Sequence, residues 1–307
     1  MQKKIAIGIM SVVALLVAIY FLFPETLFRL NGKVLRSSAG LVKKEVQIDD
    51  HQIVYLEGGK GETVLLLHGF GGNKDVWTRF SRNLTTDYHV LIPDLSGFGE
   101  SSKLSKKDYN IENQVKRLDR FTEVMNVNKF HVAGNSMGGS IALIYSAKHP
   151  QKVITLAVFD PYGLKSPNKT EWEIELAKGH NPLPIRNQDD LEKALKVLYF
   201  EPPFLFYPFL KAMTDRAISQ REFYDKIAHD MKQEHISIEP FLPTIQAPVL
   251  IIWGDADKIL DVSTVPILEK NLKTYKTLIM KDTGHMPMLE KWDESSKSYV
   301  SFLKNKN

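Results

Sequence analysis

The stretch that most constrains the fold is residues 130–147, FHVAGNSMGGSIALIYSA. A short apolar run leads into Gly134-Asn135-Ser136-Met137-Gly138, and an almost wholly apolar segment of helical length follows. This order predicts a buried strand, a very sharp turn and a buried helix. A residue on such a strained turn leaves no room for neighbouring Cβ atoms, which explains glycine at 134 and 138. We therefore expect Ser136 to project its hydroxyl from the top of a sheet, close to the positive end of the following helix.

The rest of the chain repeats the alternation of buried strand and helix. With 307 residues and 43% apolar composition, one large core can form, with room for an inserted subdomain. Strands are predicted at residues 63–67, 88–93, 153–159, 248–253 and 276–280, and the continuous apolar run 63–67 is typical of a strand covered on both faces. The pattern predicts an α/β fold with a mostly parallel, doubly wound sheet and helices on both faces. Catalytic groups should sit at the carboxyl ends of its strands.

Other segments depart from this alternation. Residues 44–57 have the alternating pattern of a hairpin around Asp49-Asp50, and residues 75–84 have the pattern of an amphipathic helix. Between about 162 and 240 the repeat stops and helical stretches take over, which predicts an inserted helical cap. The expected organisation is therefore a membrane anchor (1–23), a linker (24–44), a core in two parts (45–161 and 241–307) and the cap (162–240) between them.

The amino-terminal segment predicts a membrane anchor. Lys3 and Lys4 precede an apolar run, Ile5 to Phe23, which is long enough to cross a hydrocarbon layer of about 30 Å. A cleaved signal peptide would have a shorter run and a small-x-small site, whereas Pro24 and Glu25 follow here. We expect an uncleaved single-pass signal anchor, with the rest of the chain periplasmic or otherwise extracytoplasmic if the source is bacterial. The basic residues on the other flank leave the orientation open.

Composition excludes several classes of function. The net charge of +4 is small and the lysines are scattered, so nucleic-acid binding has no support. The absence of cysteine excludes disulfides, thiolate metal sites and a cysteine nucleophile. The glycine-rich loop at residues 68–72 lacks both the dinucleotide fingerprint and the Lys-Ser/Thr of a nucleotide-binding loop.

Three side chains, each after a predicted strand, form a candidate catalytic set. A serine hydroxyl is a weak nucleophile until a base takes its proton, and the base needs a third group to orient it. Ser136, Asp257 and His285 occur in the chain order that accompanies a nucleophile on a doubly wound sheet. The backbone N–H groups of Phe70 and Met137 are the candidate donors of an oxyanion hole.

Two further polar residues invite a catalytic interpretation but have simpler ones. His68 opens the glycine-rich loop, and we expect it to bond that loop rather than act as a base. Asp94 precedes the turn-rich segment 95–101, where a carboxylate most often caps the turn.

Taken together, these motifs resemble the α/β-hydrolase superfamily. The segments that carry the resemblance are HGFGG (68–72), GNSMG (134–138), WGDAD (253–257) and Gly284-His285. With IPD (92–94), IIW (251–253), ILDVS (259–263) and the amino-terminal span, the chain is similar to membrane-anchored monoacylglycerol lipases and related bacterial cold-adapted lipases. In that pattern the acid is the last residue of G-x-x-D, which implies Asp257. Asp255 is its principal rival and Asp160 a minor alternative.

The resemblance implies a serine carboxylic-ester hydrolase that acts through an acyl-enzyme without a metal or organic cofactor. Its substrates would be monoacylglycerols or other acyl esters, delivered at the membrane. The aromatic and proline-rich run 201–210 is expected to be loop, and it either guides acyl chains, touches the membrane or forms the core of the cap; we favour the core.

Other functions remain open at this point. Serine C–C bond hydrolases of aromatic ring-fission products share the motif and the triad order, although a soluble enzyme has no need of a membrane span. Cofactor-free haloperoxidases also use this fold. A third alternative is an inactive, membrane-tethered binding protein. The number of subunits is not indicated by the sequence.

Overall fold

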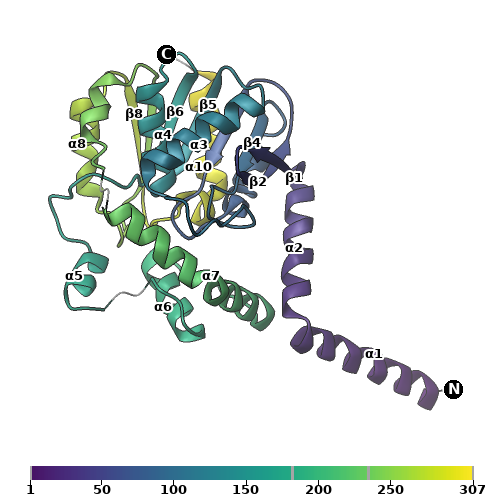
Figure 1. Ribbon diagram of the computed structural model, residues 1–307. Coiled ribbons are helices and arrows are strands. Elements are labelled where there is room, and N and C mark those ends of the chain that lie inside the picture. The colour runs from purple at the N-terminus through teal and green to yellow at the C-terminus, as the bar shows by residue number, and fades with distance from the viewer. Residues whose placement is uncertain (1, 181–182, 234–235, 306–307) are drawn as a thin grey trace.

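One eight-stranded sheet organises the chain, in the order β1-β2-β4-β3-β5-β6-β7-β8 (Figure 1). The hairpin β1–β2 and the pair β2–β4 are antiparallel, and every other neighbouring pair is parallel. The strands are β1 (Leu41–Ile48), β2 (His51–Gly58), β3 (Thr63–Leu67), β4 (His89–Pro93), β5 (Phe130–Asn135), β6 (Val153–Phe159), β7 (Val249–Gly254) and β8 (Tyr275–Met280). This confirms the expected α/β-hydrolase fold with a mostly parallel sheet.

The structure is a computed structural model that describes residues 2–180, 183–233 and 236–305. Positions 1, 181–182, 234–235 and 306–307 lie outside the described residues. They belong to the expected anchor, cap and final core segment.

Both faces of the central strands are covered, because alternate side chains of β3 enter two different cores. Leu65 and Leu67 belong to the core beneath α3 (Ile111–Val124), α4 (Met137–Lys148) and α8 (Val265–Asn271). Val64 and Leu66 belong to the core on the other face, with α10 (Trp292–Lys304). The continuous apolar runs in the sequence therefore reflect strands buried on two sides.

The segment after the glycine-rich loop differs from the expected amphipathic α-helix. Residues 75–84 fall in two short 3₁₀ helices, η1 (Lys74–Trp77) and η2 (Phe80–Asn83). Asn73 caps the first by accepting from the Asp75 N–H, and the Asp94 carboxylate accepts from the Lys74 N–H at 2.6 Å. Lys74 is thus fixed to the end of β4, and the short turns still direct Trp77 and Phe80 into the core.

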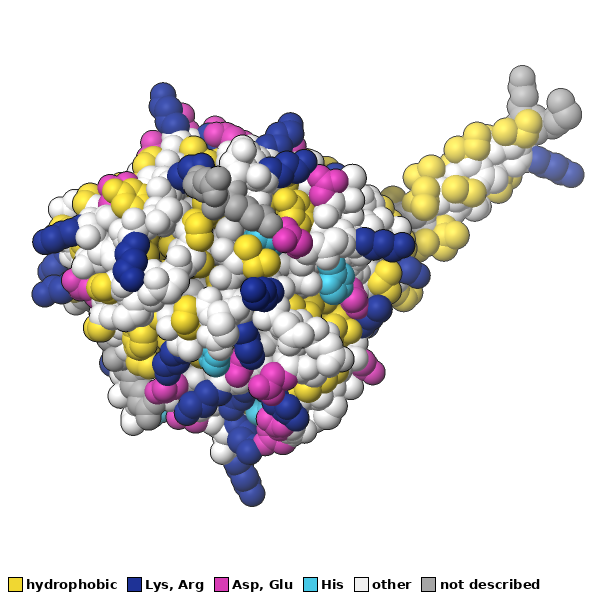
Figure 2. All heavy atoms as spheres, turned by 90° about the horizontal axis from the view of Figure 1, so that it is seen from above, with side chains coloured by type: hydrophobic (Ala, Val, Ile, Leu, Met, Phe, Trp, Pro, Cys, Tyr) yellow, Lys and Arg dark blue, Asp and Glu magenta, His cyan; other side chains and the backbone are white. Residues whose placement is uncertain are grey.

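The amino-terminal helices stand apart from the sheet. α1 (Gln2–Leu22) is apolar, long enough to cross a membrane and not buried over its span Lys3–Leu22, and it projects from the body in Figures 1 and 2. α2 (Pro24–Ser38) follows at once, and β1 begins at Leu41. Residues 41–44, expected in the linker, are paired with β2 in the sheet.

Residues 162–248 contain helices and no strand within the described part of this segment. They are α5 (Glu171–Ala177), α6 (Gln188–Leu198), α7 (Tyr207–Gln233) and η3 (Glu239–Thr244). α7 begins inside the run expected to be loop, because Pro208 occupies the first turn, where a missing N–H costs nothing.

The interpretation of this run as the core of a cap is wrong for Phe204 and Phe206. Phe204 is 83% exposed and Phe206 is 58% exposed. Their rings contact each other, yet most of their surface stays exposed.

Candidate active site

Ser136 sits on the turn between β5 and α4 with φ +52° and ψ −119°. A positive φ is strained for a residue with a side chain. A Cβ atom on Gly134 would lie 2.2 Å from the Gly138 carbonyl oxygen, and one on Gly138 would lie 2.5 Å from the Leu67 carbonyl oxygen. The two glycines are thus required by the close approach of β3, β5 and α4, as the sequence predicted.

Backbone hydrogen bonds hold this strained turn in place. The Ser136 N–H donates to the Phe159 carbonyl at 2.9 Å, and the Ser136 carbonyl accepts from the N–H groups of Ser140 and Tyr162, each at 3.1 Å. Met137 is the first residue of α4, so its N–H has no acceptor within the helix. That N–H, at the positive end of the helix dipole, is available to a developing negative charge next to Ser136.

His285 forms a hydrogen bond with Asp257, with Nδ1 and Oδ2 2.7 Å apart, and both side chains are buried. Because a carboxylate only accepts, Nδ1 carries the proton and Nε2 is left with a free lone pair. Oδ1 of Asp257 accepts from the N–H groups of Ile259 at 2.7 Å and Leu260 at 3.0 Å. Asp255, the principal rival, is exposed and accepts instead from the Thr283 N–H at 3.4 Å.

The backbone of His285 is fastened beside Ser136. The side-chain amide of Asn135 donates to the His285 carbonyl and to the Phe159 carbonyl, each at 3.1 Å. Asn135 directly precedes Ser136, so one amide joins the ends of β5 and β6 to the loop after β8. The segments that carry the three candidate residues, which are 121 and 28 positions apart in the chain, thereby lie at the carboxyl edge of one sheet.

The loop of His285 is also bonded to the helical segment. The His285 N–H donates to the Leu198 carbonyl at the end of α6, at 2.8 Å. Glu290 accepts from the Gly284 N–H with one oxygen and from the Glu201 N–H with the other, both at 2.8 Å. Sequence reasoning missed Glu290; the available signal was a single acidic residue in the apolar run MPMLE directly after Gly284-His285.

The glycine-rich loop lies against the serine turn. A Cβ atom on Gly69 would lie 3.1 Å from the Cβ of Ser136. His68 is buried beneath the loop: its Nδ1 donates to the Gly69 carbonyl at 2.8 Å, and its Nε2 accepts from the Leu95 N–H at 3.0 Å. Burial lowers the pKa of His68, which keeps the ring neutral. His68 therefore bonds the loop, as expected.

Asp94 caps the turn that follows β4. Its carboxylate accepts from the Glu100 N–H at 2.8 Å, and it pairs with the buried Lys74 ammonium at 2.8 Å. Burial opposes ionisation of the neighbouring Glu100, but the Lys74 hydrogen bond and charge, with those of Lys43, lower its pKa to about 2. The ion pair of Lys74 with Asp94, together with Glu100, thus holds the segment after the glycine-rich loop against the end of β4. The sequence indicated the cap but not its buried lysine.

Asp160 directly follows β6 and lies close to the other two groups. Candidate ligand atoms of Asp160, Asp257 and His285 all lie within 4.8 Å of one another. A metal ion does not suit this set, because Asp257 Oδ2 already accepts from His285 Nδ1 and Asp257 Oδ1 accepts from two backbone N–H groups. Only Asp160 has a free carboxylate oxygen, Oδ2.

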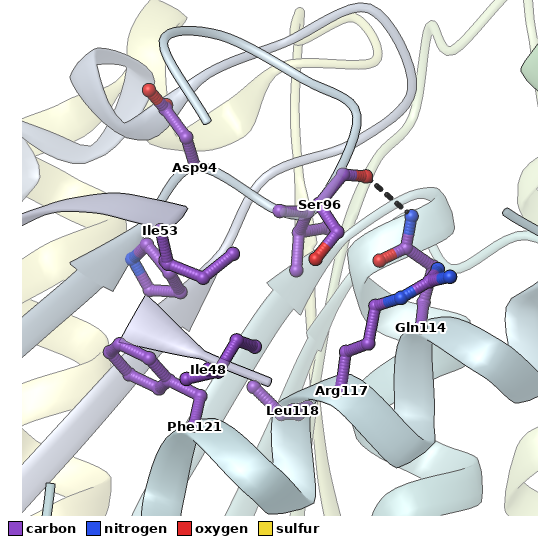
Figure 3. Close-up of a pocket in the computed structure, with 10 residues that line it drawn as sticks. Ile48, Ile53, Asp94, Ser96, Gln114, Arg117, Leu118 and Phe121 are labelled. Carbon is purple, nitrogen blue, oxygen red and sulfur yellow. Dashed lines mark hydrogen bonds between the residues drawn. The ribbon is translucent and has the colours of Figure 1, made fainter. Parts of the chain in front are cut away.

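A small hollow lies apart from these residues, under the loop after β4 and beside α3 (Figure 3). Its free volume of about 10 Å³ suits a single water molecule. Ser96, Gln114 and Arg117 line it, and each has a buried polar atom without a partner in the described residues. Ser136, Asp257 and His285 do not line it, so it is not part of the candidate active site.

Residues 62–184 match the family model described as the alpha/beta hydrolase fold. The chain is 36% identical over 255 residues to Lipase 1 of Psychrobacter immobilis, covering 82% of this chain and 80% of that protein. It is 31% identical over 299 residues to monoacylglycerol lipase abhd6-B of Xenopus laevis, covering 92% and 88%.

A solved structure is similar over nearly the whole chain. It is the crystal structure of a membrane phospholipase A described as a bacterial virulence factor. The TM-score is 0.91 at 39% identity, covering 99% of this chain and 98% of the other. The match therefore includes the amino-terminal helices as well as the sheet.

We predict that His68 is the neutral Nδ1–H tautomer at neutral pH, because Nδ1 faces a carbonyl and Nε2 faces an N–H group. In ¹⁵N-correlated NMR spectra of the detergent-solubilised enzyme, assigned by loss of the His68→Gln signals, the ring should not titrate between about pH 5 and 8. A ring that takes up a proton near its ordinary pKa would contradict this assignment.

Proposed function

Because this chain belongs to the α/β-hydrolase family and is a lipase-like member of it, we propose that it hydrolyses acyl esters through Ser136, His285 and Asp257. The observation that carries the proposal is the 2.7 Å hydrogen bond between His285 Nδ1 and Asp257, in a loop fastened to the residue before Ser136. This bond leaves Nε2 of His285 as the free base that a serine nucleophile needs.

The reaction has two halves. Ser136 Oγ attacks the ester carbonyl while His285 Nε2 takes its proton, and the N–H groups of Phe70 and Met137 stabilise the oxyanion. When the tetrahedral intermediate collapses, His285 returns the proton to the leaving alcohol and the acyl group stays on Ser136. Water, deprotonated by His285, then releases the fatty acid and restores the hydroxyl. Asp257 orients His285 and stabilises its cation throughout.

Monoacylglycerols and other medium-chain or long-chain acyl esters are the proposed substrates. The half-exposed ring of Phe70 lies on the glycine-rich loop and contacts Phe98, with ring centroids 5.6 Å apart, and Tyr224 of α7 at 6.1 Å. These rings give the surroundings of Ser136 an apolar side that suits a hydrocarbon chain. The names of the related lipases point to the same class of ester.

We also propose that residues 162–240 act as a cap over the site. Support comes from the bonds of Leu198 and Glu201 to the loop of His285, which place the end of α6 beside the candidate base. With residues 162–240 as the cap, the chain divides into a membrane anchor, a hydrolase core in two parts and this cap.

The end of the anchor helix α1 contacts the cap, so the cap lies at the membrane surface. Tyr20 and Phe21, near the end of α1, contact Tyr207 at the start of α7, with ring centroids 6.2 and 5.3 Å apart. Phe204 and Phe206, directly before α7, have exposed rings that contact each other. Aromatic rings are enriched at membrane interfaces, so this loop is suited to rest in the headgroup region next to α1.

For orientation, Lys3 and Lys4 favour a cytoplasmic amino terminus, which puts the hydrolase outside the cytoplasm. In intact spheroplasts an added protease should then digest the hydrolase part. Protection of that part until the cells are lysed would refute this orientation.

We predict that Phe204→Ser/Phe206→Ser weakens hydrolysis of monoacylglycerol in vesicles, raising KM about tenfold through lost apolar contact with lipid. Hydrolysis of a short, soluble p-nitrophenyl ester should not change. Ile279→Ser, at an exposed position on β8, is the matched control. Equal losses of activity on the two esters would mean that Phe204 and Phe206 contribute to the active site and not to contact with the membrane.

Ser136→Ala should lower kcat for p-nitrophenyl esters and monoacylglycerols by about 10⁶-fold, because it removes the nucleophile. Asp257→Asn should lower kcat by about 10⁴-fold, whereas Asp255→Asn should leave kcat unchanged. A fluorophosphonate probe should label the wild type but not Ser136→Ala.

The same assays separate the rival functions. A protein that cleaves ring-fission diketones and none of the esters would be a C–C bond hydrolase. One that neither turns over esters nor reacts with the probe would be a binding protein on this fold.

A further inference from the structure

The carboxyl group of Asp160 lies close to Asp257 and His285, and the proposed mechanism does not use it. The residue is fully buried and has a positive φ of 46° at the end of β6. Its Oδ1 accepts from the Gly254 N–H at 2.9 Å, and its Oδ2 has no partner in the described residues. A buried carboxylate oxygen without a donor is costly, so this arrangement needs a physical explanation.

The surroundings of Asp257 supply that explanation. An ionised carboxylate can accept about four hydrogen bonds. Asp257 accepts three, from the N–H groups of Ile259 and Leu260 and from His285 Nδ1. One acceptor position remains on a carboxylate whose candidate ligand atom lies within 4.8 Å of one on Asp160.

Two neighbouring carboxylates in a dry site cannot both be ionised without strong repulsion, so the pair retains one proton. On Asp257 that proton would remove the negative charge that three N–H groups stabilise, the imidazole Nδ1–H of His285 among them. On Asp160, Oδ2 is free to carry it.

We propose that Asp160 is a positioning residue that, as a neutral carboxylic acid, donates a hydrogen bond from Oδ2 to the Asp257 carboxylate. This inference rests on the proposed function of Asp257 as the acid of the triad. The bond fills the last acceptor position of Asp257, fixes the plane of the carboxylate toward His285 and leaves a single negative charge on the pair.

The charged groups around Asp160 also favour a proton on its carboxyl group. Burial, followed by the negative charge of Asp257, raises the pKa of Asp160 well above its ordinary range, and Glu290 adds to the effect. The titratable groups that face Asp160 are therefore Asp257 after β7, His285 after β8 and Glu290 in α9 (Pro287–Glu290). Each of the two acidic groups favours a neutral Asp160.

The test compares Asp160→Asn with Asp160→Ala in the full-length enzyme. Asparagine can accept from Gly254 with its oxygen and donate to Asp257 with its amide, and it tolerates a positive φ. Asp160→Asn should therefore keep kcat within about threefold of wild type, with the same pH profile, because the donor is preserved. Asp160→Ala lacks the donor and should lose about 10- to 100-fold in kcat.

The pH profile provides a readout that a purely structural role would not move. Without the bond from residue 160, the Asp257 charge acts more strongly on His285 and favours its protonated form. The acid limb of kcat/KM in Asp160→Ala should move upward by about half a pH unit or more.

Infrared difference spectroscopy tests the proton directly and does not depend on turnover. At about pH 8, where ordinary carboxyl groups are ionised, the spectrum of wild type minus Asp160→Asn should contain the carbonyl stretch of one protonated carboxylic acid. The same band should persist in Ser136→Ala, so the result stands even if the esterase assignment fails.

Three results would overturn the proposal. The first is a loss in Asp160→Asn as large as that in Asp257→Asn, which would make Asp160 an ionised acid. The second is the absence of the carboxylic acid band. The third is a folded Asp160→Ala enzyme with wild-type kcat and pH profile. If Asp160→Ala does not fold, Asp160→Asn and the infrared band decide.

Discussion

The close approach of two glycines determines most of this architecture. Gly134 and Gly138 let β5, β3 and the start of α4 come nearer than any side chain would permit. The strain of Ser136 follows from that approach, and so does the aim of the α4 dipole at the space beside it. A larger residue at either position would push the helix away from the sheet. The strained turn and the position of the Met137 N–H at the start of α4 are therefore consequences of one steric constraint.

Around this turn the protein concentrates buried polar groups and satisfies them with one another. The Asn135 amide connects two loops through their carbonyls, Asp257 receives three N–H groups, and Glu290 joins the loop of His285 to Glu201. Such networks are stable only when each member has a partner. The neutral form proposed for Asp160 would complete this set, and it explains how two carboxyl groups can share a buried site.

The sequence predicted the parts of the fold that follow from local pattern. Buried strands and the serine turn have short-range signatures, and the spacing after two later strands indicated Asp257 and His285. The partners of these residues were not predictable, because Glu290 and Asp160 act through contacts between elements far apart in the chain. The pattern of residues 75–84 was apolar enough for a helix, yet Lys74 is tied to Asp94 and the segment forms 3₁₀ turns. Aromatic content alone also could not distinguish a cap core from the exposed surface of Phe204.

The central claim is that Ser136 is the nucleophile and that His285 and the two backbone donors converge on its reaction centre. A crystal structure of the enzyme after reaction with an alkyl fluorophosphonate tests this most directly. We expect phosphorus bonded to Ser136 Oγ, one phosphonyl oxygen within hydrogen-bonding distance of the Phe70 and Met137 N–H groups, and His285 Nε2 facing the serine oxygen. An adduct on another residue, or an imidazole of His285 turned away from an adduct on Ser136, would contradict it.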